Sequence, residues 1–397
     1  MIKTTIYFKF VFLFFFYLCS FKINAQTLNL TTNDVSLLFP LPSLEEWNDL
    51  PQGTSAGQNG ELLPLTIVNQ LPQLVAIAPN DKVYSVLRVV GLRIDPCFHE
   101  GPSPIKCQPQ IRMIWQPLAE GDEITSTFDA SLHSFYNLTT EQFTEFIKIY
   151  SILVQNNGAQ NTMAPLGVNP ILKSQGLQGP FFTELKKLVY QYAGANNLSR
   201  VTFMQLFMTG NIWEFGGFDI DHQELTPINI ARTQHTTQKF KNSASPQPVW
   251  FHGSIEPQLT ASEDDLSYLV LDSREVSLDN EEQIKQATKA AFHIENPNLH
   301  NPGTIDCVSC HVAQSAKFWS MQQFPTLNLE QIFKNDIFQS PLNLQNTSPL
   351  QNQTNVLRAF GYFMESPITA QRTINESASV AVAVNAYLAN FKNNNLK

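Results

Sequence analysis

The chain has 397 residues, of which 15 % are charged and 11 % are aromatic, and its formal net charge is −9. This acidic balance argues against a nucleic-acid partner, because phosphate backbones are bound by clusters of lysine and arginine. The aromatic content supplies enough apolar surface for a packed core, and the length suggests two or three domains.

The first 25 residues predict a secretory signal peptide. Lysines precede an apolar run from Val11 to Phe21, and Ala25 provides a small residue for cleavage. An uncleaved anchor is the alternative, although the run is shorter than the roughly 20 apolar residues that span a bilayer. A lipid anchor through Cys19 is less favoured, since its neighbours differ from those of a lipoprotein signal. We therefore expect an exported protein, periplasmic or extracellular, without a membrane-spanning segment after processing.

Residues 26–278 carry patterns of both strands and helices. Runs rich in β-branched and aromatic residues predict strands at 82–94, 110–118, 200–210 and 248–255. Helical periodicity appears at 139–155 and 181–193. The region is therefore expected to form one or more α+β domains, whose function the sequence does not indicate.

Cys97 and Cys107 enclose a loop rich in glycine and proline and are separated by 10 residues. In an exported protein the default prediction is a disulfide, which stabilises the fold by roughly 3 kcal/mol in the loop-entropy description. A catalytic dithiol is the alternative, but the spacing is not that of a redox motif.

A group of acidic residues and one histidine follows the strand predicted at 200–210. An oxygen-ligated metal site is one interpretation, but the spacing matches no known cation-binding loop, and a solvated turn is favoured. The residues are Glu214, Asp219, Asp221, His222 and Glu224.

A helix is predicted at 279–294. Asp279 and Glu282 have the spacing of a capping box at its start. Its apolar residues recur on one face, at Ile284, Ala287, Ala291 and Ile294.

The segment Cys307-Val308-Ser309-Cys310-His311 has the C-x-x-C-H arrangement of covalent haem attachment. Two thiols with this spacing can both reach the vinyl groups on one edge of a porphyrin, and the adjacent imidazole then lies under the iron. Zinc is an alternative, but no second ligand pair is near. A thioredoxin-like dithiol and a simple oxidised pair are further alternatives. We expect one covalent haem c, with His311 as the proximal iron ligand.

Residues 279–397 resemble a class I cytochrome c domain, which implies an all-α fold for this part of the chain. The resemblance implies that the first helix, with Ala291 and Phe292, contacts a terminal helix that carries Tyr387 and Leu388. It also implies that the carbonyl of Pro325 accepts a hydrogen bond from His311, and that Leu327 packs on the macrocycle. One departure is the longer link between the first helix and Cys307.

The sixth iron ligand implied by the resemblance is Met364, which lies just before the predicted terminal helix. A thioether ligand favours ferrous iron and raises the reduction potential. The competing possibilities are Met321, His300, His293 and an open site.

The sequence therefore predicts an exported mono-haem c-type cytochrome that transfers electrons through a haem ligated by histidine and methionine. A redox partner protein is expected. The alternatives are a haem enzyme, a sensor of a gas or peroxide, and a binding protein in which haem is structural. An electron carrier is favoured over a catalyst.

Overall fold

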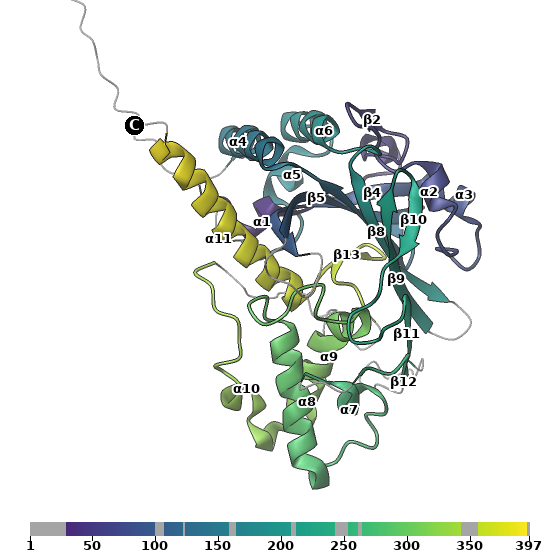
Figure 1. Ribbon diagram of the computed structural model, residues 1–397, viewed down its shortest axis with the longest axis vertical. Helices are drawn as coiled ribbons and strands as arrows, with labels where there is room; N and C mark the ends of the chain where they lie inside the picture. Colours follow the sequence, from purple (N-terminus) through teal and green to yellow (C-terminus); the bar gives the residue numbers. More distant parts are fainter. Residues whose placement is uncertain are drawn as a thin grey trace, which may run out of the picture.

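The computed structural model describes residues 29–99, 107–121, 124–158, 164–207, 212–242, 253–260, 264–342 and 356–394. The predicted signal peptide lies outside these residues. Within them the central element is a ten-stranded antiparallel sheet (Figure 1). Its strands are β1 (Ser36–Leu38), β4 (Leu87–His99), β5 (Cys107–Ala119), β6 (Ser126–Thr127), β7 (Ala130–Asn137), β8 (Leu198–Phe207), β9 (Ile212–Asp221), β10 (Glu224–Pro227), β11 (Thr237–Asn242) and β12 (Gly253–Glu256).

Helices cover both faces of this sheet. The helices in the N-terminal part of the chain are α1 (Thr32–Val35), α2 (Leu65–Val68), α3 (Asn80–Val86), α4 (Thr140–Asn157), α5 (Pro170–Gln175) and α6 (Pro180–Tyr192). The helices in the C-terminal part of the chain are α7 (Ser267–Val270), α8 (Glu281–Ile294), α9 (Cys307–Gln323), α10 (Leu329–Ile332) and α11 (Gln371–Asn394). The remaining strands form two small hairpins, β2 (Ala56–Gly57) with β3 (Gly60–Glu61) and β13 (Phe360–Phe363) with β14 (Ser366–Thr369).

The main hydrophobic core lies between the sheet and α4 and α6. Leu132 and Tyr136 point from β7 toward this side and are buried with Phe143, Phe146 and Phe181 from the two helices. Helix α4 begins in a capping box in which Thr139 and Gln142 exchange hydrogen bonds of 2.9 and 3.2 Å. Both helices were predicted from their apolar periodicity, and that prediction is confirmed.

A second hydrophobic cluster lies on the opposite face of the sheet. Trp213 and Phe215 of β9 are buried there with Ile284 of α8 and with Val312 and Trp319 of α9. Figure 1 shows α8 and α9 on the side of the sheet opposite to α4 and α6. The predicted helix at 279–294 is confirmed, but it is capped at Asn280 without a side-chain hydrogen bond, so the Asp279–Glu282 capping box is not formed.

The prediction of an all-α cytochrome c-like domain in the C-terminal part is wrong. Helices α8 and α9 do not form a separate helical core, because α8 packs on α9 and α7, and α9 in turn packs on β9 and β11 of the large sheet. The part also contains the hairpin β13–β14. The expected contact between Phe292 and Tyr387 is replaced by others, since Phe292 packs on Phe333 and Tyr387 packs on Phe143 at 5.8 Å.

Helix α11, which runs along one side of the molecule in Figure 1, joins the last part of the chain to the first. The side chain of Asn385 exchanges hydrogen bonds of 2.8 and 2.9 Å with the backbone of Leu30. Ser377 of α11 is hydrogen-bonded to Ser36 of β1 at 2.7 Å. None of the helices in the described ranges combines the length and the apolar character needed to cross a membrane.

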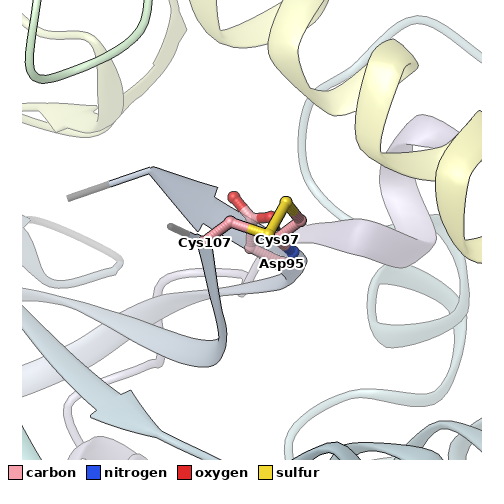
Figure 2. Close-up of a disulfide and its surroundings, with 3 residues drawn as sticks. All are labelled: Asp95, Cys97 and Cys107. Atoms are coloured by element: carbon pink, nitrogen blue, oxygen red, sulfur yellow. Dashed lines mark hydrogen bonds between the residues drawn. A yellow bond between two sulfur atoms is a disulfide. The ribbon is translucent and has the colours of Figure 1, made fainter. Parts of the chain in front are cut away.

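The predicted disulfide between Cys97 and Cys107 is confirmed (Figure 2). It ties the end of β4 to the start of β5, and the backbone N–H of Cys97 donates to Asp95 Oδ1 at 2.9 Å. The strand predicted at 82–94 divides into α3 and the first part of β4. For the strand predicted at 248–255, only the part from Gly253 onward is described.

Candidate functional site

The C-x-x-C-H motif occupies the first turn of α9, which is fixed to the sheet by a buried cap. Asp306 Oδ1 accepts from the backbone N–H of Ser309 and from Gln238 Nε2, both at 2.9 Å. Gln238, on β11, in turn accepts from the backbone N–H of Val308 at 2.9 Å. Asp306 Oδ2 lies 3.6 Å from Arg232 Nη1. The start of the helix is therefore held by three hydrogen bonds and one ion pair, and the side chains that make them are buried or nearly so.

Cys307 and Cys310 are free thiols. Both are half-buried and line the same cavity as His311. Burial raises the pKa of the Cys307 thiol well above its usual range, and it raises that of Cys310 to about 11. In the folded chain both groups are therefore protonated thiols of low nucleophilicity.

The His311 imidazole has a fixed tautomer. Its Nδ1 is hydrogen-bonded to the carbonyl oxygen of Leu357, so that nitrogen carries the proton and Nε2 keeps its lone pair. Burial lowers the pKa of His311 to about 4, against the opposing effect of this hydrogen bond. The ring also packs on Phe215 of β9, with the ring centroids 4.7 Å apart. A neutral imidazole held in this way is suited to bind a metal through Nε2.

The cavity lies between α9 and the face of the sheet opposite to α4. Its walls come from β4, β5, β7, β8 and β9, from the first turn of α9, from the segment before β13 and from the first turns of α11. Its volume is about 210 Å³, and the cavity is partly open to solvent. This is below the roughly 300–1,000 Å³ found for small-molecule and cofactor sites.

Arginines dominate the charge of the cavity wall. Five of them face two carboxylates, those of Asp306 and Glu376; the arginines are Arg93, Arg112, Arg200, Arg358 and Arg372. Arg93 and Arg112 stand directly opposite each other on β4 and β5, an unfavourable arrangement of like charges. Two carboxylates offset it, since Asp95 lies 3.5 Å from Arg112 and Glu376 lies 3.1 Å from Arg93.

Two of these arginines have buried N–H groups without a hydrogen-bond acceptor among the described residues. They are Arg112 Nε and, in Arg358, both Nε and Nη1. The remaining contacts of Arg358 are with Asp129 and, at 3.2 Å, with the carbonyl of Phe128. Burial lowers the pKa of Arg112 to about 10, and Arg93 adds to this effect. Unpaired buried donors are rare in folded proteins, and these two arginines leave donors on the wall to which an anionic ligand could bind.

Glu376 of α11 balances part of this charge. It accepts from Arg372 Nε at 2.7 Å and from Arg93 Nη2 at 3.1 Å. Burial alone would raise its pKa, but the charges of Arg372, Arg93 and Arg112 outweigh burial and lower the pKa from 4.5 to about 2.

A pH dependence of stability follows from Glu376. Because its folded-state pKa is below the unfolded value of 4.5, its stabilisation is complete above that pH and is lost as pH falls toward 2. A shift of this size corresponds to roughly 3 kcal/mol. We expect Glu376→Gln to be less stable than wild type at pH 7, and the difference to shrink between pH 4.5 and pH 2. Urea unfolding at a series of pH values measures both quantities.

The matched control is Glu184→Gln, which removes an exposed carboxylate paired with Lys187 at 2.7 Å. This variant should follow the wild-type pH profile within about 0.5 kcal/mol. An acid loss of stability that is equally steep in Glu376→Gln and in wild type would contradict the assignment.

The residues on this cavity fit a covalently bound haem. The motif provides two free thiols and an imidazole with an available Nε2, all on one wall. Haem carries two carboxylates, which are the acceptors that the unpaired N–H groups of Arg112 and Arg358 lack.

The structure does not bring Pro325, Leu327 or Met321 to this cavity. The chain after His311 continues as one helix to Gln323, and at 1.5 Å per residue Pro325 lies roughly 20 Å and Met321 roughly 15 Å along the axis. The carbonyl of Pro325 accepts from Asn328 N at 3.3 Å, so the implied hydrogen bond from His311 to Pro325 is replaced by the one to Leu357.

Leu327 packs at the edge of the second hydrophobic cluster instead of on the cavity wall, and Met321 lines a different pocket beside Lys317. Met364 is 61 % exposed in the turn between β13 and β14, and its carbonyl accepts from Thr127 N at 3.1 Å. The wall of the cavity does not include Met364.

His293 and His300 have their ring nitrogens engaged elsewhere. Asp264 contacts His293 Nδ1 at 2.7 Å and His300 Nε2 at 2.8 Å, and Asp336 contacts His293 Nε2 at 2.9 Å. His300 Nδ1 is 3.3 Å from Thr304 Oγ1. All four ring nitrogens therefore have partners, with His293 in the last turn of α8 and His300 in the link before Cys307.

The acidic group after β8 is distributed over the hairpin of β9 and β10. Glu214 accepts from Gln205 at 2.6 Å, and Asp219 accepts from Arg200 at 2.6 Å. Asp221 and His222 are exposed at the turn. Within the described part of the chain, no three His, Cys, Asp or Glu side chains are grouped so as to hold a metal ion between them.

The arginines and His133 on the cavity wall were not predicted from the sequence. One local pattern could have pointed to the arginines: Arg93 and Arg112 interrupt apolar strand sequences whose other residues are buried. No local pattern brings them together with the motif, since that depends on strand pairing over long distances.

Comparison of the chain with family models, with curated proteins and with solved structures found no match.

Proposed function

We propose that the protein is an exported c-type haem protein that transfers electrons, with one haem bonded to Cys307 and Cys310 and ligated by His311. The observation that carries the proposal is the meeting of the motif and the unpaired arginine N–H groups on one cavity. The scaffold is the large antiparallel sheet with its covering helices, and not a class I cytochrome c fold.

The two cysteines hold the group by thioether bonds. Each thiol adds across one vinyl C=C, so that its sulfur bonds to the carbon next to the ring and its proton goes to the outer carbon. No oxidant or reductant is consumed, but both thiols must be reduced, as they are in this structure. His311 binds the iron through Nε2, and the Leu357 carbonyl keeps that ring oriented and makes the ligating nitrogen more basic.

The arginines hold the carboxylate edge. Arg112 and Arg358 donate their free N–H groups to the two propionates, which also relieves the like-charge contact between Arg112 and Arg93. A haem bound in this way supplies one-electron chemistry at its iron. A redox partner protein is expected to approach where the cavity opens to solvent.

The test is production of the full chain in a host with cytochrome c maturation enzymes. We expect one haem per chain by pyridine haemochrome assay, retention of the colour after denaturation and acid extraction, and a reversible one-electron redox titration. The matched control is the same chain produced without the maturation enzymes, which should be colourless. Complete extraction of the haem from matured protein, or failure to acquire it, would refute the proposal.

One observation favours a second candidate function, that of a haem enzyme or a sensor of a diatomic ligand or peroxide. Met364 is exposed and outside the cavity, so a haem there does not receive the sixth ligand that the class I family uses. Ferrous carbon monoxide binding distinguishes the two functions, because a carrier with two protein ligands binds it poorly and an open iron binds it readily.

A further inference from the structure

His133 lies in the middle of β7, on the face of the sheet that forms the cavity wall. The strand register places it between Ile114 of β5 and Thr202 of β8. Alternate residues Leu132 and Ser134 point to the opposite, apolar core. His133 is therefore presented to the same space as the haem-attachment motif.

The imidazole of His133 has no hydrogen-bond partner among the residues that the structure describes. The residue is half-buried, and it lines the cavity instead of filling the packed core. Burial, together with the charges of Arg112, Arg93 and His311, lowers its pKa to about 3. The ring is thus neutral, and one nitrogen carries an unused lone pair.

The register also sets how His133 lies relative to His311. The His311 ring packs on Phe215 of β9. Phe215 is in line with Met204 and Ser131, two residues from His133, and strand β8 separates β9 from β7. Phe215 and His133 are therefore two strand spacings apart across the sheet and two residues apart along it, or roughly 12 Å. The residue of β9 in line with His133 and Thr202 is Gly217, and the side chains of Thr202 and Ile228 pack beside it.

We propose that His133 is the second axial ligand of the iron, so that a haem attached to α9 is ligated by His311 on one side and by His133 of the sheet on the other. This inference rests on the proposed function. It assigns bis-histidine coordination, a closed iron and a lower reduction potential than histidine–methionine ligation gives. It therefore favours electron transfer over binding of a gas.

Met204 is the competing ligand on the cavity wall. It stands opposite Phe215 on the neighbouring strand and is 4 % exposed within the second hydrophobic cluster. Its thioether is thus used in packing, whereas the nitrogens of His133 lack any partner. The observations favour His133.

The experiment compares matured wild type with His133→Ala and Met204→Leu by visible and electron paramagnetic resonance spectra of the ferric protein and by ferrous carbon monoxide binding. We expect wild type and Met204→Leu to be low-spin and to bind carbon monoxide poorly. His133→Ala should become high-spin and bind it readily, and added imidazole should restore the low-spin spectrum. If the alanine variant fails to fold, His133→Met replaces it in the test. This variant keeps a ligand at the position and should remain low-spin, with a raised reduction potential.

The outcomes separate this inference from the proposed function. Covalent haem with a low-spin spectrum that His133→Ala leaves unchanged overturns the His133 assignment alone, and a change in Met204→Leu instead identifies Met204. A high-spin wild type also overturns it and indicates an open site. Absence of covalent haem from matured wild type overturns both.

Discussion

The double variant Cys307→Ala, Cys310→Ala is expected to carry no covalent haem when it is produced with cytochrome c maturation enzymes. Each thioether needs one of these sulfurs, and both sulfurs line the cavity that holds the imidazole of His311. The haem that survives denaturing electrophoresis should therefore fall from one per chain to none. Each single variant should retain one thioether and a shifted haemochrome band.

The control for this variant is Cys97→Ala, Cys107→Ala, which removes the disulfide at the end of β4. It should keep its covalent haem while losing roughly 3 kcal/mol of stability. Haem that remains attached after denaturation of the Cys307→Ala, Cys310→Ala chain would show that the attachment site lies elsewhere.

Asp306→Ala is expected to lower the free energy of unfolding by roughly 3–5 kcal/mol. Asp306 is fully buried, caps α9 and lies 3.6 Å from the Arg232 guanidinium, whose nitrogens have no hydrogen bond among the described residues. Loss of the cap accounts for about 1 kcal/mol. The larger part is the cost of leaving Arg232 buried without its counter-ion. Urea unfolding of wild type and variant measures the difference.

Two control variants separate the contribution of the helix cap from that of the ion pair. Asp306→Asn keeps a side-chain oxygen for Ser309 N and removes only the charge, so it should retain the helix cap and lose the pairing with Arg232. Asp279→Ala removes a charged residue from the short segment before α8 and should change stability by less than about 0.5 kcal/mol. If Asp306→Ala costs no more than Asp279→Ala, the buried network does not fix the start of α9.

Local patterns predicted those parts of the fold that depend on neighbouring residues. Helices α4, α6 and α8 have apolar stripes at helical spacing, and the disulfide joins two cysteines close in sequence. The same patterns do not say which surface an apolar stripe will cover. Ile284 of α8 and Trp319 of α9 are buried in one cluster that also contains strand residues of the large sheet, and the predicted all-α domain is therefore not formed.

In the candidate site, too, only the residues that are close in sequence were predicted. Cys307, Cys310 and His311 were predicted because five consecutive residues carry the pattern. The hydrogen bond from His311 to Leu357, and the positions of Arg112, His133 and Arg358 on one cavity, depend on strand register and on the return of the chain after α10. The family resemblance placed the acceptor at Pro325, but the unbroken length of α9 carries that residue away.

The burial of the two motif thiols has a consequence for biosynthesis. The enclosing walls extend in sequence from Arg93 to Glu376, so the chamber does not exist until the C-terminal helix has docked. Once it has, Cys307 and Cys310 are protonated and slow to react. If the proposed function is correct, the haem must be attached while the newly exported chain is still unfolded. A chain that folds before the maturation enzymes reach it can then no longer acquire haem.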